Sequence, residues 1–211
     1  MPGIFNVLKN DKIGAVGIGA LIVFISLVLL AGIAASVLIQ TSNILELQTL
    51  KTGRDTTEDV STGLEVFSIE GYAADDSDIS KLAIMVRPRS GSKEIDLTTV
   101  YIEISNNDKK VVMNYSTSEY SDPGGLDDIF SDSSFPEDDY PYMDPLNRDG
   151  TQYGLLVVDD NDDSISKTLP IINKGDKVFI TINATGVFNN LPERTNVWGR
   201  IVPEIGYEGF I

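Results

Sequence analysis

The feature that most constrains this chain is an uncharged stretch close to its N-terminus. No Asp, Glu, Lys or Arg occurs in the thirty-three residues from Ile13 to Leu45, and the part up to Ile39 is almost entirely apolar. As a helix, residues 13–39 would extend about 40 Å at ~1.5 Å per residue, longer than the ~30 Å hydrocarbon core of a bilayer. The stretch therefore predicts a helix that must be covered by lipid or by other protein.

Two ordinary interpretations of this segment are a cleaved secretory signal and an N-terminal membrane anchor. A secretory signal has an apolar region of about 7–15 residues, so the length of this run argues against it, whereas the anchor stays open. Small residues recur along the run, at Gly17, Gly19, Ala31, Gly32, Ala35 and Ser36. Such residues let helices approach closely, which favours packing against other helices. The apolar pattern continues through Leu45, Leu47 and Leu50, and we expect the helical region to span residues 15–63.

Residues 1–14 have the character of a leader that stays in the cytoplasm. Lys9 and Lys12 precede the apolar run, and positive charge is retained on the cytoplasmic side of a membrane. Gly14 lies at the head of the run, where a peptidase could cut on the N-terminal side of the apolar segment. Such a cut would leave the apolar helix as the N-terminus of the mature chain.

The composition narrows the classes of function. Sixteen Lys and Arg against thirty-two Asp and Glu give a net charge of −16, which argues against nucleic acid as a partner because little phosphate can be neutralised. The chain contains no His and no Cys, which removes the usual general base, the Ser-His-Asp triad and any disulfide framework. We therefore expect no enzyme, no catalytic residue and no cofactor beyond a structural divalent cation.

From Leu64 onward the hydrophobic pattern has a period of two, which is typical of β-strands. Strands are predicted at residues 64–73, 81–87, 100–105, 110–115, 153–158, 167–172, 177–183 and 196–201. Turn sequences separate several of them, among them Asn173-Lys174-Gly175-Asp176. Because no amphipathic helix lies between the strands, we expect residues 64–211 to form an immunoglobulin-like antiparallel β-sandwich. The predicted fold class is α+β, with a long N-terminal α-helix before the sandwich.

Residues 122–152 form a long acidic insertion that is rich in Asp and Pro. Between Asp122 and Asp163 there are thirteen carboxylates and a single basic residue, Arg148. The simpler interpretation is a solvated outer loop that faces the medium.

A sharper interpretation is a site for calcium or magnesium at Asp159, Asn161 and Asp163, which alternate like the start of a calcium-binding loop. Ser164 stands where an EF-hand needs Gly, and Pro170 stands where it has a bidentate Glu. The pattern therefore fails as an EF-hand and is compatible only with a looser site of oxygen ligands.

Two tripeptides match the acceptor pattern for N-glycosylation, Asn114-Tyr115-Ser116 and Asn183-Ala184-Thr185. Each match alone is weak evidence because the pattern is short. In an exported surface protein both asparagines become candidates for modification.

Two strings near the N-terminus resemble the archaeal flagellins, or archaellins, which are made as type IV pilin-like precursors. The strings are GAVGIGALIVFI at residues 14–25 and AASVLIQTS at residues 34–42, and RIVPEIG at residues 200–206 is similar to the family's ending. The resemblance implies cleavage by a prepilin-type peptidase between Gly14 and Ala15. Gly19 occupies the fifth mature position, where bacterial type IV pilins have Glu, and this favours the archaellin branch.

The resemblance implies a structural subunit of the archaeal flagellum filament, extracellular, self-assembling and used for swimming. Its partners would be further copies of the chain, other archaellins, the peptidase, and the archaellum membrane platform and motor, with the precursor held in the membrane. Packing in the filament core is assigned to Gly17, Gly19, Leu21, Phe24, Leu27, Ala31, Gly32, Ala35 and Leu38. The family is also commonly N-glycosylated. Alternative functions are an adhesion-type type IV pilin, a minor pilin-like protein, or a membrane-anchored β-sandwich that binds a ligand.

Overall fold

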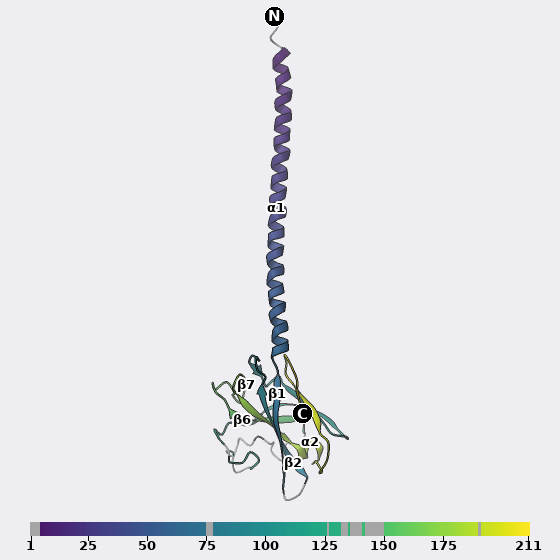
Figure 1. Cartoon of the computed structure of the whole chain (residues 1–211), viewed down its shortest axis with the longest axis vertical. Coiled ribbons are helices and arrows are strands. Elements are labelled where there is room, and N and C mark those ends of the chain that lie inside the picture. The colour runs from purple at the N-terminus through teal and green to yellow at the C-terminus, as the bar shows by residue number, and fades with distance from the viewer. Residues whose placement is uncertain are drawn as a thin grey trace. The chain divides into compact units, whose positions relative to one another are not determined.

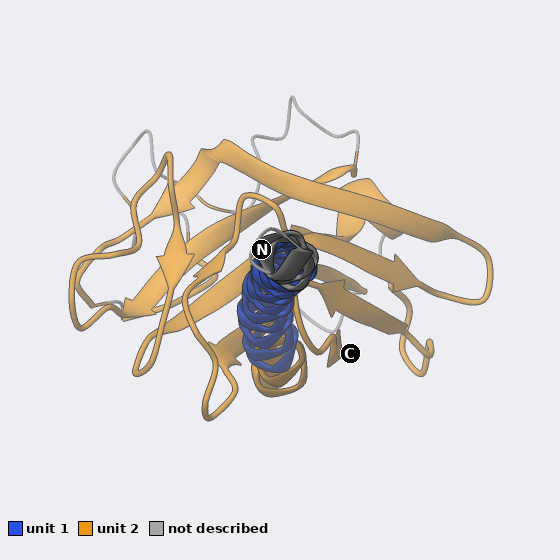
Figure 2. Ribbon diagram, turned by 90° about the horizontal axis from the view of Figure 1, so that it is seen from above, with its two compact units in different colours: residues 1–54 blue, residues 55–211 orange. Residues whose placement is uncertain are grey.

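A computed structural model describes residues 5–74, 78–125, 127–131, 135, 141, 150–189 and 191–211, with side chains from Gly14 onward. The chain divides into two compact units, residues 1–54 and residues 55–211 (Figure 2). The first unit contains most of helix α1 (Phe5–Ser61), and the second contains the last turns of that helix and all of the strands (Figure 1).

Helix α1 is continuous over 57 residues and passes through the predicted cleavage site without a break. Two hydroxyl groups in the uncharged part form hydrogen bonds within the helix itself. Ser26 and Thr41 each donate to the carbonyl four residues earlier, at 2.9 Å. The helix ends at Ser61, just before Gly63, where an added Cβ would lie 2.7 Å from the carbonyl oxygen of Tyr207. A residue with a side chain does not fit at that point.

After the last turns of α1, the second unit consists of strands and one short helix. The strands are β1 (Leu64–Ala73), β2 (Ile79–Pro88), β3 (Ile95–Asp96), β4 (Tyr101–Ser105), β5 (Lys110–Ser121), β6 (Gln152–Asp159), β7 (Ile171–Ile172), β8 (Lys177–Asn183), β9 (Trp198–Val202) and β10 (Gly209–Phe210). Helix α2 (Ala184–Phe188) follows β8 directly, with Asn183 as its N-cap. The main sheet has the order β1-β2-β8-β6-β5-β4-β9-β10, and β3 pairs with β7 in a separate ribbon.

The prediction of α+β is confirmed, but the predicted immunoglobulin-like antiparallel sandwich is wrong in its detail. In the described residues eight strands belong to one mixed sheet, in which β5 and β6 run parallel. Parallel neighbours need a crossover of a dozen or more residues, whereas antiparallel neighbours need only a short turn. Nearly all of the acidic insertion, up to residue 151, forms this crossover between β5 and β6.

The two edge strands of the sheet approach each other where the chain leaves α1. Gly63 forms a parallel bridge with Tyr207, just before β10. Leu64 donates its N–H to the Tyr207 carbonyl at 3.2 Å, and the Tyr207 N–H donates to the Thr62 carbonyl at 2.8 Å. The sheet therefore curls into a nearly closed barrel, and the C-terminal residues lie against the start of β1.

The inside of this barrel is the larger hydrophobic core. Alternate residues of neighbouring strands face it, for example Ile102 and Ile104 of β4 and Ile180 and Ile182 of β8. Tyr153 of β6 is fully buried there, and its hydroxyl donates to the carbonyls of Leu97 and Val100 at 3.1 and 2.9 Å. Burial raises the pKa of Tyr153 far above its usual range.

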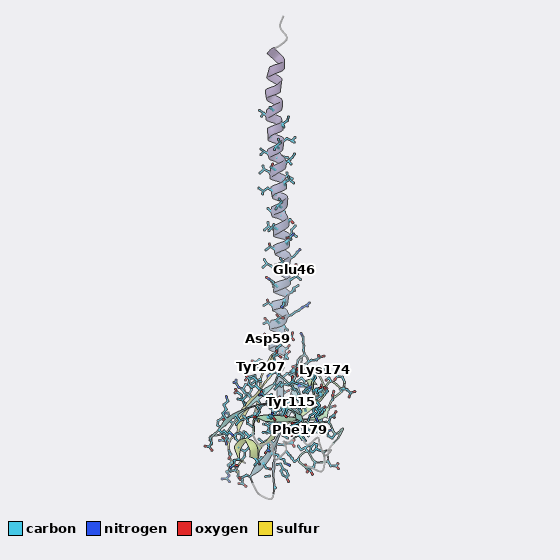
Figure 3. All side chains as sticks on the ribbon, turned by 180° about the vertical axis from the view of Figure 1, so that it is seen from behind. Glu46, Asp59, Tyr115, Lys174, Phe179 and Tyr207 are labelled. Atoms are coloured by element: carbon cyan, nitrogen blue, oxygen red, sulfur yellow. The ribbon has the colours of Figure 1, made fainter. Side chains whose placement is uncertain are left out.

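A second, smaller core lies on the opposite face of the sheet. Ala83, Leu156 and Phe179 point away from the barrel interior and are buried beneath Phe135 of the acidic insertion. Figure 3 shows Phe179 among the side chains of the β-domain. Thr181 donates to the carbonyl of Pro141, so the insertion is tied to the sheet by backbone as well as by apolar contacts. The acidic insertion is therefore more than a solvated loop, because part of it covers the sheet.

Candidate functional site

The largest surface feature of the described residues is the apolar part of α1. Every side chain from Gly14 to Leu50 is exposed, including Phe24 at 66% of its full area. Leu27, Val28, Leu29 and Leu30 are consecutive and all exposed; at about 100° per residue they cover the helix on all sides. A surface helix of a soluble domain has one apolar stripe instead.

By length and composition, the part of α1 from Gly14 to Ser61 is suited to cross a membrane. The same surface is suited to bundling with identical helices, because small residues interrupt it. An added Cβ at Gly17, Gly19 or Gly32 would meet no atom within 4 Å. Within the described chain no contact requires glycine at these positions.

The residues predicted to pack in a filament core all lie in this part of α1 and are all exposed. They are Gly17, Gly19, Leu21, Phe24, Leu27, Ala31, Gly32, Ala35 and Leu38. Gly14 and Ala15, the predicted cleavage pair, lie in the same helix and are exposed as well. The assignment of these roles stays a prediction.

The two predicted glycosylation sites differ in their surroundings. Asn114 is exposed in the middle of β5. Asn183 is half-buried, and its Oδ1 accepts a hydrogen bond from the Gly186 N–H at 3.1 Å as the N-cap of α2. The side chain at Asn114 is therefore the more accessible of the two.

The predicted cation ligands Asp159, Asn161 and Asp163 lie in and after the end of β6. Asp159 forms an ion pair with Lys177 at 3.0 Å, and Asp163 is exposed with a φ of 55°. The carboxylates whose oxygens come close together in the structure are a different set, which the sequence pattern did not indicate. The prediction of a cation on Asp159, Asn161 and Asp163 stays untested.

The converging carboxylates in the described residues are Asp160, Asp162 and Asp176, whose oxygens lie within 4.8 Å of one another. Their oxygens already accept hydrogen bonds from the loop. Asp160 accepts from the Ile165 N–H at 2.9 Å, and buried Asp176 accepts from the Asn173 N–H at 2.8 Å. These hydrogen bonds hold the loop between β6 and β8 in place, which accounts for the grouping of the three carboxylates.

A hollow of about 310 Å³ lies on the sheet near β4 and β9, with Trp198 and Phe210 in its wall. Its charged residues form a chain in which Glu103 pairs with Arg200 at 2.7 Å and with Lys110 at 2.8 Å. Hydrogen bonds from Arg200 and Lys110 lower the pKa of Glu103 to about 2. The hollow therefore combines ion-paired side chains with the aromatic side chains of Trp198 and Phe210.

Comparison with known proteins places these features in a family. The family model of the archaeal-type flagellins matches residues 14–211. Flagellin B2 of Methanocaldococcus jannaschii is 40% identical over 203 residues, covering 96% of this chain and 88% of the relative. Flagellin B3 of Methanococcus voltae is 38% identical over 222 residues, covering 98% and 92%.

Solved structures agree with the fold. The crystal structure of archaeal flagellin FlaB1 from Methanocaldococcus jannaschii has a TM-score of 0.59 and 31% identity, covering 71% of this chain and 87% of that one. A subunit of the archaeal flagellum of Methanospirillum hungatei has a TM-score of 0.57 and 15% identity, covering 92% and 90%. At that identity the second likeness supports the fold alone.

Proposed function

The chain belongs to the archaeal-type flagellins, and from this premise we propose that residues 15–63, mainly helix α1, become the shared core of a helical filament after a leader has been removed. As an archaellin, the protein is a structural subunit of the archaeal flagellum filament outside the cell, and it is not an enzyme. The observation that carries the proposal is the apolar surface from Gly14 to Ile39, which is exposed on all sides.

The driving force is the burial of this surface between copies. Burying one Leu, Ile, Val or Phe side chain contributes about 1.5–3 kcal/mol, so a dozen of them outweigh the freedom lost on association. Gly17, Gly19 and Gly32 leave room for close approach of a neighbouring helix. If each copy uses one face of α1 on one neighbour and a different face on the next, the contacts do not close and a filament results. Other archaellins with similar helices can join the same assembly.

Before assembly, the same helix holds the precursor in the membrane. Residues 1–14 form the leader, and Lys9 and Lys12 keep it on the cytoplasmic side. A prepilin-type peptidase then cuts between Gly14 and Ala15. One observation supports this junction: the family match begins at Gly14. The helix released from its leader moves from lipid into the growing filament.

The remaining partners follow from the place of the subunit in the cell. The β-domain, residues 64–211, forms the outer shell of the filament. Subunits are added at the archaellum membrane platform, and rotation of the filament by the membrane motor drives swimming. Asn114 is placed to carry an N-linked glycan on this shell, since it is exposed on β5; Asn183 is the second candidate, although its side chain caps α2.

The test is expression of the full chain together with a prepilin-type peptidase in an archaeal host that lacks its own archaellins. Filaments are expected, and N-terminal sequencing of their subunit should begin at Ala15. A Gly14→Val variant should remain in the membrane with its leader attached, whereas the matched Gly53→Val variant should be processed. Filaments built from uncut subunits, or a different first residue, would contradict the proposal. Loss of swimming on deletion separates an archaellum subunit from an adhesion pilin.

A further inference from the structure

The hollow near β4 and β9 has two exposed aromatic side chains in its wall, and the proposed filament core uses neither of them. Trp198 of β9 is 49% exposed and Phe210 of β10 is 70% exposed. Exposed aromatic surface at a hollow is a common mark of a binding site. At about 310 Å³ the hollow is at the lower end of the range of ligand pockets, ~300–1,000 Å³. We call it the aromatic hollow.

Charged side chains beside the rings supply hydrogen-bonding groups of both kinds. Glu103 uses one carboxylate oxygen, Oε2, for both Lys110 and Arg200. Arg200 uses Nε on Glu103 and Nη1 on Glu208, the latter at 3.3 Å. Among the described residues, Oε1 of Glu103 therefore remains an acceptor and Nη2 of Arg200 remains a donor. A ligand in the aromatic hollow meets a donor and an acceptor that ion pairs hold in position.

The charges around the aromatic hollow balance one another, although the chain as a whole has a net charge of −16. Lys110 and Arg200 are paired with Glu103, and Arg200 is paired with Glu208 as well. A balanced site has no net attraction for an ion, which favours a neutral, polar ligand. A sugar ring has hydroxyl groups that both donate and accept, and an apolar C–H face that packs on an aromatic ring. A saccharide therefore matches both parts of the wall.

The candidate glycan acceptor Asn114 lies on the same outer face of the sheet. Asn114 of β5 is exposed and lies opposite Tyr101 of β4, which in turn lies opposite Val202 of β9. Arg200 is two positions before Val202 on its strand, so both side chains belong to one face. At ~4.8 Å between strands and ~3.3 Å per residue, Asn114 and Arg200 are about 12 Å apart. A short chain of linked sugars covers this distance.

We propose that the aromatic hollow binds carbohydrate, namely the outer sugars of a glycan carried by Asn114 of the same chain. One sugar ring packs on Trp198, and its hydroxyl groups exchange hydrogen bonds with Glu103 and Arg200. The glycan is thereby held against the β-domain instead of extending into the medium. The inference rests on the proposed glycosylation of Asn114 and is independent of filament assembly.

The first test asks whether the aromatic hollow binds sugar. The full chain is made in a bacterium without N-glycosylation and kept in micelles of a detergent that contains no sugar. Saturation-transfer NMR probes it with the methyl glycosides of glucose, galactose, mannose and N-acetylglucosamine, and with the glycan released from native subunits. At least one probe should bind, with a millimolar Kd. The inference is overturned if none of them binds.

Substitutions then locate the bound sugar. Trp198→Ala should weaken binding about tenfold or more, because it removes the stacking surface, and Trp198→Phe should restore part of the affinity. Phe67→Ala is the matched control, since Phe67 is 61% exposed on β1 and is not in the wall of the hollow. Equal affinity of Trp198→Ala and wild type would place the sugar elsewhere and overturn the inference. Should Trp198→Ala fail to fold, Phe210→Ala carries the same test.

The second test asks whether the occupant is the glycan on Asn114. Trp198 is the only tryptophan of the chain, so quenching of its fluorescence by acrylamide measures access to the aromatic hollow. In subunits dissociated from native filaments, quenching of wild type should be several-fold weaker than quenching of Asn114→Gln. Asn183→Gln is the control and should match wild type. Equal quenching of all three overturns the inference, as does a native subunit whose mass includes no glycan.

Electron microscopy separates this inference from the proposed assembly. Trp198→Ala should form filaments at the wild-type yield, because the aromatic hollow holds a glycan and not a neighbouring subunit. If this variant folds normally by circular dichroism but forms no filaments, the hollow is a contact between copies and the inference is overturned. If wild type also forms no filaments, the proposed assembly is wrong, whereas sugar binding by the unassembled chain still supports the hollow as a carbohydrate site.

Discussion

Gly206 lies so close to Thr62 that an added Cβ would overlap the Thr62 carbonyl oxygen, and its φ of +95° is one that residues with side chains rarely adopt. This glycine allows the C-terminal turn to lie against the exit of α1. The neighbouring Tyr207 then makes the two hydrogen bonds that join the edges of the sheet. The close approach of Gly206 to Thr62 thus accompanies the contacts that close the barrel.

We expect Gly206→Ala to destabilise the β-domain by about 3 kcal/mol or more, because it combines an unfavourable φ, at about 1–2 kcal/mol, with a steric overlap. Gly175→Ala is the matched control, since Gly175 has a φ of +114° but no atom within 4 Å of an added Cβ. It should cost only about 1–2 kcal/mol. Urea unfolding of the full chain in detergent measures both, and equal losses would show that the overlap is relieved by movement of the turn.

Tyr153→Phe should destabilise the β-domain by about 1–3 kcal/mol, because it leaves the buried carbonyls of Leu97 and Val100 without their donor. The matched change is Tyr115→Phe. The Tyr115 hydroxyl donates to the Lys167 carbonyl at 2.9 Å near the surface, where water can replace it, so the loss should be below about 1 kcal/mol. A larger loss for Tyr115→Phe, measured by urea unfolding, would contradict this ranking.

The ion pairs of Glu103 predict a pH dependence of stability. Arg200 and Lys110 lower the pKa of Glu103 to about 2 from its ordinary value of 4.5, so the unfolded chain binds this proton more readily. The stabilisation is present in full above pH 4.5 and is lost as the pH falls towards 2. The difference in unfolding free energy between wild type and Glu103→Gln should therefore shrink over this window. A difference in unfolding free energy that stays constant with pH would contradict this prediction.

Gly32→Leu should lower filament yield several-fold while leaving the precursor in the membrane, because the larger side chain occupies the space proposed for a neighbouring helix. Leucine is a better helix former than glycine, so weaker assembly would not reflect a weaker helix. Gly53→Leu is the control, since an added Cβ there also meets nothing within 4 Å and the residue lies outside the proposed packing set. Electron microscopy of sheared filaments measures the yield; equal yields would remove Gly32 from the interface.

Intact-mass measurement of native subunits tests the two glycosylation sites. Asn114→Gln should lose the mass of one glycan, because Asn114 is exposed on β5. Asn183→Gln should change the mass little and should cost about 0.5–2 kcal/mol of stability, since it removes the N-cap of α2. A wild-type mass equal to that of the unmodified mature chain would exclude both sites.

The helix and most of the strands were predictable because each depends on a local pattern. The uncharged run to Leu45 and the alternation of residues such as Ile102 and Ile104 are visible in any short window of sequence. β1 and β8 were predicted with their observed bounds. In the same way, the candidate packing residues of α1 follow from their apolar or small side chains alone.

The remaining features depend on contacts between distant segments. The parallel pairing of β5 with β6 involves a close approach at Gly154 of β6, where an added Cβ would lie 2.6 Å from the carbonyl oxygen of Glu119 in β5. The short strand β10 was missed because its two residues carry no periodicity. Asp176 and Asp160 lie sixteen positions apart, so the pattern at Asp159, Asn161 and Asp163 could not reveal their meeting.

The pairing of Gly63 with Tyr207 joins two segments that are far apart in the sequence. Ile211, a few residues further on, exchanges two backbone hydrogen bonds with Gly199. Loss of this short segment would leave the apolar helix intact but would remove the contacts that close the β-domain. The helix for assembly and the closure of the barrel therefore depend on opposite parts of the sequence.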